Sequence, residues 1–261
     1  MKNNGWGGKD SDWVLKKFYM GLRHQRIFRI SDIQGQMVDA VISMRGKGPV
    51  PANCFLQIQR NDFLTVKLTD NEESISLTIN SDGLIVMVNL DEDNPITVEQ
   101  VEEIFSAIAT VVVPMTEAKD KITRLGIVHE YERQGFENSA KTMFSDYLKF
   151  DLKGVPDSLH LRFALKNPTE RALISLGKKG DYKNVIFTLS SRREKEDLEE
   201  AVKEEVEAKE QNPPTVVTAS IDYQLYYVPQ VSLKNVNIKG HLSESKTYIE
   251  KLKETGAVLR Q

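Results

Sequence analysis

Short apolar runs separated by turn residues dominate the stretch from residue 27 to residue 90. Many of their side chains are β-branched or aromatic, and runs of about four to eight such residues are typical of strands. Asn61-Asp62 and Ser81-Asp82-Gly83 lie between neighbouring runs, which predicts antiparallel hairpins. The predicted strands cover 27–33, 37–44, 54–59, 63–68, 74–79 and 84–90.

A similar pattern returns from residue 122 onward. Residues 158–166 alternate strictly between apolar and polar side chains, so one face of that strand is predicted to be buried. A longer alternating stretch ends at Pro229, which has no backbone N–H to donate. Strands are predicted at 122–133, 158–166, 171–177, 184–191 and 215–229.

Helical spacing marks the segment after Thr97, where Gln100 stands at the reciprocal position of a capping box. Pro114 is expected to end or bend this helix. The segment 12–22 also has apolar side chains at helical spacing and polar residues able to cap it. Further helical segments are predicted at 116–121, 138–149, 192–211 and from Ser243 to Gly256.

These elements predict an α+β protein with two antiparallel β-meander layers, each packed with helices. We expect an N-terminal tail and short helix over 1–22, a first domain over 23–121, and a second domain over 122–261. The second domain includes the charged helix 192–211. The similar make-up of the two halves raises the hypothesis of a duplicated unit. One continuous sheet shared by both halves is the alternative.

The chain has 261 residues and a net charge of −3, and its acidic excess is concentrated in one segment. Residues 192–211 contain nine acidic and five basic residues, and Leu198, Val202 and Val206 recur at four-residue intervals. This spacing predicts a helix with a narrow apolar stripe. We interpret it as a solvated helix that crosses between two strands, or as an element that docks on a partner.

A basic segment lies near the other end of the chain. Between residues 16 and 29 every charged side chain is basic, and Phe18 and Tyr19 are interleaved with them. Such a patch attracts a polyanion, or the acidic helix 192–211 of the same chain or of a second copy. The predicted partner-binding residues are Trp6, Trp13, Lys16, Lys17, Phe18, Tyr19, Arg23, Arg26, Arg29, Leu198, Val202 and Val206.

Candidate chemistry centres on one histidine. His129 and Tyr131 share the apolar face of the strand predicted at 122–133, and with Tyr223 they are the candidate residues of a small-ligand site or an enzyme. The commoner interpretation is a histidine and a tyrosine whose polar atoms are satisfied in the core. Nucleotide-binding, hydrolase and zinc-protease motifs are absent, and no two histidines have the local spacing of metal ligands. We therefore expect no catalytic residue, no metal and no cofactor.

Composition narrows the class of protein further. A single cysteine excludes a disulfide framework, and apolar residues make up 40% of the chain, which is enough for a folded core. No apolar run is long enough to span a membrane, and the first residues lack the apolar core of a signal peptide. These features predict a cytoplasmic protein with no membrane contact.

The order of segments around the Thr97 helix also carries a resemblance. An acidic, proline-ended break at 91–95 precedes the helix at 97–109, and the next strand carries Arg124-Leu125-Gly126 and ends in Tyr131-Glu132-Arg133. Over residues 75–260 this layout resembles a sporadically distributed family of uncharacterised bacterial proteins of about this length. The family has no established activity, and its scattered distribution implies an association with phage defence or mobile elements.

Together these observations predict a non-enzymatic interaction or scaffold subunit of a bacterial complex, which binds a protein partner or itself. One alternative is a nucleic-acid-binding accessory protein that uses the basic segment 16–29. A second alternative is a small-ligand binder or an enzyme around His129.

Overall fold

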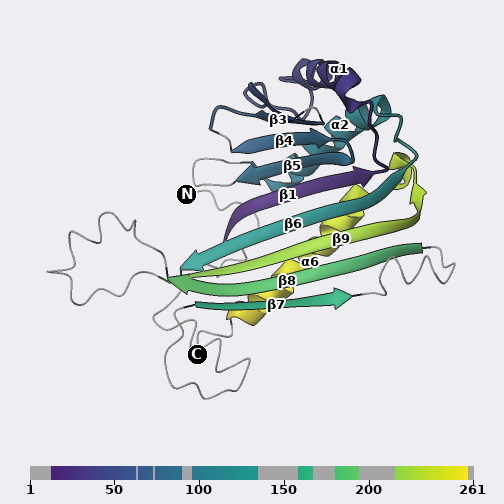
Figure 1. Cartoon of the computed structure of the whole chain (residues 1–261). Coiled ribbons are helices and arrows are strands. Elements are labelled where there is room, and N and C mark those ends of the chain that lie inside the picture. Colours follow the sequence, from purple (N-terminus) through teal and green to yellow (C-terminus); the bar gives the residue numbers. More distant parts are fainter. Residues whose placement is uncertain are drawn as a thin grey trace.

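One antiparallel sheet of nine strands forms the centre of the protein (Figure 1). The computed structural model describes residues 13–62, 64–72, 74–89, 96–134, 158–166, 180–193 and 215–257. The strands lie in the order β2-β3-β4-β5-β1-β6-β9-β8-β7, and each neighbouring pair is antiparallel. Their bounds are β1 Val14–His24, β2 Gln57–Asp62, β3 Thr65–Thr69, β4 Ile75–Asn80, β5 Gly83–Asn89, β6 Ile122–Gln134, β7 Ser158–Lys166, β8 Gly180–Arg193 and β9 Thr215–Val231.

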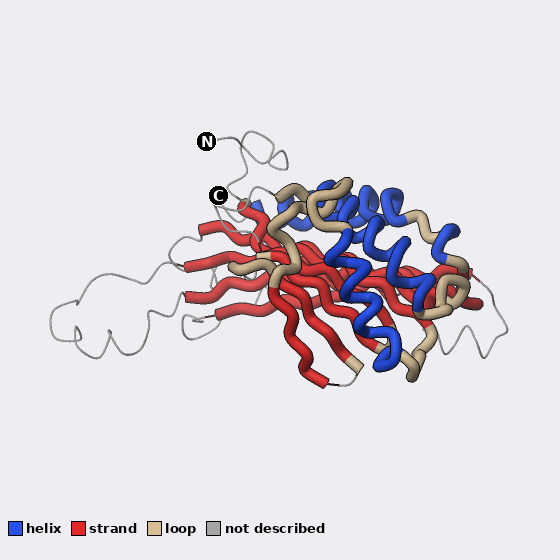
Figure 2. The backbone as a smooth tube through the Cα atoms, turned by 90° about the horizontal axis from the view of Figure 1, so that it is seen from above, coloured by secondary structure: helices blue, strands red, loops and turns tan. Residues whose placement is uncertain are grey.

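The described helices cover one face of this sheet, as the view from above shows (Figure 2). They are α1 (Ile30–Ser43), α2 (Val98–Met115) and α6 (Ile238–Ala257), with a short 3-10 helix, η1, at Leu233–Asn235. Helix α2 packs on β5 and β1, while α6 packs on β9 and β6, and α2 also touches α1 and α6. Alternate strand residues are therefore buried beneath the helices, as Phe18, Met20 and Leu22 are in β1.

Most of the strand predictions are confirmed. The runs predicted within 63–90 correspond to β3, β4 and β5, and Ser81-Asp82-Gly83 makes the connection between the last two. The alternating stretches at 122–133, 158–166 and 215–229 correspond to β6, β7 and β9. The α+β class and the antiparallel pairing follow from the local pattern of side chains alone.

Near the N-terminus the prediction is wrong for two elements: the predicted helix is a strand, and the two predicted strands that follow it form a helix. Residues 14–24 form β1 instead of a helix, because β5 and β6 pair with this segment on both sides. The runs 27–33 and 37–44 were predicted as strands, but most of this segment forms α1. Its buried residues recur at helical spacing across both runs, and they are Ile30, Ile33, Gln34, Met37, Val38 and Val41.

Two helix boundaries also differ from the prediction. Residues 116–121 form a turn that leads into β6, so no second helical piece follows α2. Helix α6 begins at Ile238, well before Ser243, because the side chain of Asn237 accepts a hydrogen bond from the backbone N–H of Gly240 at 3.0 Å. The capping box at Thr97 is confirmed, and Pro114 lies inside the last turn of α2.

The strands of the two halves do not form separate layers but lie edge to edge in one sheet. This is the continuous shared sheet given above as the alternative. Strand β1 lies between β5 and β6, so the expected boundary after residue 121 falls at the start of a central strand. In each half the first strand pairs with the strand that precedes the closing helix, β1 with β5 before α2 and β6 with β9 before α6. A duplicated unit stays a prediction. The helix at 138–149, the strand at 171–177 and the helix at 192–211 lie outside the described residues, apart from Arg192 and Arg193 at the end of β8.

We expect Thr97→Ala to lower the free energy of unfolding by about 1 kcal/mol, because both bonds of the capping box would be lost or weakened. The Thr97 hydroxyl accepts from the backbone N–H of Gln100 at 3.2 Å, and the Gln100 side chain accepts from that of Thr97 at 2.8 Å. Urea unfolding followed by circular dichroism measures the change. The matched control is Thr110→Ala in the same helix, where the hydroxyl donates back to Ser106 O. Equal losses in both variants would contradict the prediction.

Candidate functional site

The sheet face opposite the helices, called the open face from here on, has an apolar centre. On this face Tyr19 of β1 pairs across the strands with Met87 of β5 and Val128 of β6. In the next row, Gly21 of β1 pairs with Ile85 and Gly126 on the same two neighbours. These residues form the central patch, namely Tyr19, Gly21, Ile85, Met87, Gly126 and Val128.

Of the two glycines in the central patch, Gly126 has room for a side chain, whereas Ile85 already packs against Gly21. A Cβ atom at Gly126 would have only the carbonyl oxygen of Gly21 within 4 Å, at 3.9 Å. At Gly21 a Cβ atom would meet Cγ1 of Ile85 at 3.3 Å. Neither glycine has a backbone in the left-handed region. The packing of the described residues therefore does not require a glycine at position 126.

Charged and polar side chains surround the central patch. The ammonium of Lys17 lies 3.4 Å from a carboxylate oxygen of Glu130, and Arg23 lies 3.9 Å from Asp82 at the opposite end of β1. Both pairs are partly exposed, so each contributes little to stability. The patch is thus an apolar centre with one ion pair toward each end of β1.

A hydrogen-bonded chain borders the patch on β6 and β9. Arg124 donates to the Tyr226 hydroxyl at 3.4 Å, this hydroxyl donates to Gln224 at 2.5 Å, and the Gln224 amide donates to Asp222 at 2.6 Å. Burial raises the pKa of Asp222, although the Gln224 amide and the nearby positive charges of Arg124 and Arg162 act against that rise. These polar groups satisfy one another, so this side of the open face is held in one arrangement.

The structure places three of the predicted partner-binding residues on this face, namely Lys17, Tyr19 and Arg23. The remaining basic side chains point elsewhere. Arg29 pairs with Glu117 at 2.5 Å, and Arg26 donates to Ser81 at 3.3 Å. Lys16 is half-buried next to an irregularity in the β1–β6 register. The basic segment is therefore divided among several surfaces, because β1 ends at His24 and both Arg26 and Arg29 lie beyond it.

Two of the predicted partner-binding residues are wrong. Trp13 is 7% exposed and Phe18 is fully buried, because both lie in the core on the helix side of β1. The guanidinium of Arg133 covers the Trp13 ring at 4.8 Å from its centroid. These side chains hold the sheet to its helices and are closed to a partner. The other predicted residues, Trp6, Leu198, Val202 and Val206, lie outside the described residues.

His129, the centre of the alternative enzyme hypothesis, is enclosed between β6 and α6. Its Nε2 lies 2.9 Å from the Ser245 hydroxyl, which itself donates to Leu242 O at 2.8 Å, so Nε2 carries the proton and donates. The ring packs against Phe18 with centroids 4.9 Å apart. Burial, with a smaller contribution from the positive charges of Lys246 and Lys253, lowers the pKa of His129 to about 3. This histidine is therefore neutral and closed to solvent.

Tyr131 lies on the same buried face as His129. The ammonium of Lys253 is 4.3 Å from the centroid of the Tyr131 ring, and it also lies 2.9 Å from Glu250. Burial raises the pKa of Tyr131, and the negative charges of Glu250 and Glu99 add to that rise. The ring stabilises a lysine that is itself only 3% exposed, which is a structural role.

Tyr223 belongs to a polar cluster that the sequence did not reveal. Its hydroxyl donates to Glu244 at 2.9 Å and accepts from Nδ1 of His241 at 3.0 Å, while Lys183 donates to both oxygens of Glu244 at 2.6 and 2.8 Å. Burial raises the pKa of Tyr223, and its bond to Glu244 raises it further, so the phenol stays protonated. The cluster joins β8 and β9 to the first turns of α6. The three-residue spacing of His241 and Glu244 was its only local signal.

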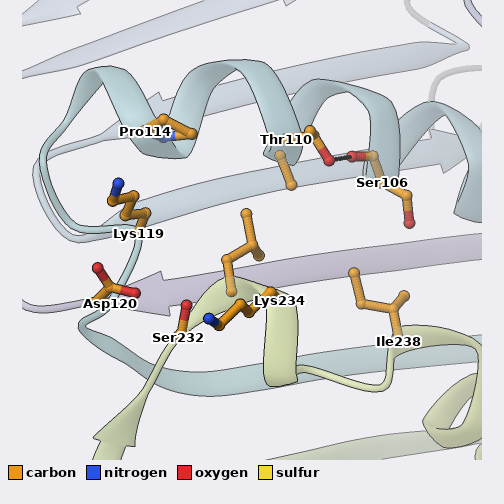
Figure 3. A pocket seen from close by; sticks show the side chains of 10 residues that line it. Ser106, Thr110, Pro114, Lys119, Asp120, Ser232, Lys234 and Ile238 are labelled. Carbon is orange, nitrogen blue, oxygen red and sulfur yellow. Dashed lines mark hydrogen bonds between the residues drawn. The ribbon is translucent and has the colours of Figure 1, made fainter.

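A groove lies between α2 and the segment that leads into α6 (Figure 3). It has a volume of about 510 Å³, and a second hollow of about 410 Å³ shares Ser106 with it. Lys119, Asp120 and Lys234 place both signs of charge at its rim. Neither hollow is lined by His129, Tyr131 or Tyr223. The candidate ligand residues are therefore packed inside the protein, away from both of these hollows.

Comparison with known proteins adds no identity to this geometry. The chain matches no model of a protein family and no curated protein. In the described part of the chain, no helix has the length and apolar character needed to cross a membrane. Within the same residues, no three His, Cys, Asp or Glu side chains are grouped to hold a metal ion.

We expect the free energy of unfolding to fall as the pH is lowered below about 6.5. The folded pKa of His129 is lowered to about 3, so between these pH values the unfolded chain binds a proton that the folded chain does not. His129 alone contributes a slope of at most about 1.4 kcal/mol per pH unit. The pKa values of His24 and His241 are also lowered by burial and act in the same direction. Urea unfolding at a series of pH values measures the slope.

The slope of the wild type is compared with that of His129→Gln. The glutamine keeps an amide donor for Ser245 but has no group that titrates. This variant should lose part of the pH dependence. His160→Gln, at an exposed position of β7, is the control and should keep the slope of the wild type. Equal slopes in the wild type and His129→Gln would show that His129 does not contribute.

Proposed function

We propose that this chain is a non-enzymatic protein-interaction subunit that binds protein through the central patch of its open face. The observation that supports this most directly is the glycine at position 126. A glycine in the interior of a strand lowers the stability of the fold by about 0.5–1 kcal/mol relative to an alanine. Such a glycine often marks a place where another backbone or a ligand comes close. Since a Cβ atom at Gly126 would meet only the Gly21 carbonyl oxygen, at an ordinary contact distance of 3.9 Å, the packing of the described residues does not explain this cost.

The composition of the surrounding surface supports the same proposal. Protein interfaces combine an apolar centre with a polar rim, and tyrosine, methionine and arginine are enriched in them. The central patch supplies Tyr19, Met87 and the 38% exposed Ile85, and the rim supplies Arg23 and Arg124. A large side chain over bare backbone would bury apolar surface that now faces water.

The two other functions have weaker support. A nucleic-acid site needs basic side chains gathered on one surface, but Lys17, Arg23 and Arg29 each lie beside a carboxylate. A ligand site at His129 needs an opening to solvent, but the ring is fully buried. Membership of a bacterial complex, and the association with phage defence or mobile elements, stay predictions.

The test is a comparison of proteins captured from the native host by three tagged forms of the full chain. They are the wild type, Gly126→Val and the control Gly35→Ala. Gly126→Val fills the bare backbone with a side chain that strands favour, so the fold should persist. Gly35 is exposed on α1, and no atom lies within 4 Å of the Cβ that alanine would add.

We expect wild type and Gly35→Ala to retain the same proteins, the untagged chain included, and Gly126→Val to lose at least one of them. Quantitative mass spectrometry of the captured proteins measures the loss. Thermal melting of each form shows that it is folded. Identical sets from all three folded forms would contradict a role for the central patch.

A further inference from the structure

We infer that the protein bound by the central patch is a second copy of this chain, with the two sheets packed face to face. This inference rests on the proposed function, and it adds the identity of the partner. A symmetric dimer needs a surface that is complementary to itself after a twofold rotation. The open face meets that requirement in shape, in charge and in size.

Complementarity of shape comes from the order of rows along the strands. Tyr19 and Val128 form one row, and Gly21 and Gly126 form the next, about 7 Å away. Consider a twofold axis parallel to the sheet, perpendicular to the strands, and above the Met20–Ile127 pair. It places the Tyr19 row of one copy over the glycine row of the other, and the reverse. Tyr19 of one copy then lies over Gly21 of the other, and Val128 of one copy lies over Gly126 of the other.

The same axis brings opposite charges together on β6. Glu130 lies three residues to one side of Ile127, and Arg124 lies three residues to the other side. Both side chains are on the open face, because they alternate with the buried Leu125, Ile127 and His129. The rotation therefore sets Arg124 of one copy opposite Glu130 of the other, at both ends of the patch. Opposed charges at such positions orient a complex and select its partner.

The size of the sheet is also sufficient. A strand of seven residues such as β5 is about 24 Å long, and nine strands are about 43 Å wide. Their product is about 1,000 Å², whereas a stable complex buries about 800 Å² on each partner. Two such sheets would stack about 10 Å apart, with strands within about 30° of alignment. Part of the open face is enough for a stable dimer.

The first experiment measures the oligomeric state of the full-length chain by light scattering and sedimentation equilibrium over a range of concentrations. We expect a dimer for the wild type and for Gly35→Ala. Gly126→Val should dissociate at a concentration at least about tenfold higher than the wild type, because its side chain occupies the space that Val128 of the second copy needs. A wild-type chain that is a monomer at every concentration would overturn the inference.

The second experiment uses the predicted contact between Arg124 and Glu130. Arg124→Glu and Glu130→Arg should each weaken the dimer by about tenfold, because like charges then face each other at two places. When the two variants are mixed, both contacts become attractive, so a heterodimer should form. Isotope labelling of one variant and native mass spectrometry identify it. Failure of the mixture to associate better than either variant alone would overturn this geometry.

The two proposals fail in distinguishable ways. A monomeric wild type, together with a captured protein that only Gly126→Val loses, would overturn the dimer and support an interface for a different protein. A dimer unaffected by Gly126→Val would place self-association elsewhere on the chain and would overturn the inference, and the captured proteins would then decide the proposed function separately. A monomer whose captured proteins are insensitive to Gly126→Val would overturn both.

Discussion

The pairing of β1 with β6 is the contact on which the rest of this structure depends. It joins the strands that come from the first half of the chain to those from the second, and without it the sheet would divide into two smaller ones. Both strands are long, and their register runs from Val14↔Glu132 to His24↔Ile122. Since each also pairs with a strand of its own half, the junction is supported from both sides.

A single layer of helices follows from this junction. Helix α2 covers the strands on one side of it and α6 those on the other, so the buried faces of β1 and β6 meet beneath the helices. The interior there includes His129, Tyr131 and the nearly enclosed Lys253. Buried polar side chains are tolerated when they find partners, such as Ser245 for His129 and the Tyr131 ring for Lys253. His129 and Tyr131, which the sequence offered as candidates for a ligand site or an enzyme, are thus part of the core.

The opposite face acquires its character from the same register. Gly21 and Gly126 are more than one hundred positions apart in the chain, yet the β1–β6 register sets them side by side. Apolar residues of β5 and β6 then border the two glycines. A surface suited to binding is assembled from segments of which none, taken separately, resembles a binding motif.

Local pattern alone determined much of the fold. Alternation over 122–133 and 215–229 and the Thr97 capping box predicted β6, β9 and the start of α2, because the physical causes of these elements lie within a few neighbouring residues. The same reasoning failed for 12–22. Phe18 and Leu22 share a face in a helix and in a strand alike, so only pairing with β5 and β6 decided between them.

The candidate site shows the same division. The sequence pointed to Tyr19 and its basic neighbours, but it could not indicate Ile85, Met87 or Gly126, since their proximity to Tyr19 exists only in the sheet. It likewise could not show that Phe18 and His129 would be enclosed, because burial depends on which face the helices cover. Composition and periodicity determined most of the strands, with β1 and the segment of α1 as the exceptions. Long-range register and the position of the helix layer decided which residues would meet and which would stay exposed.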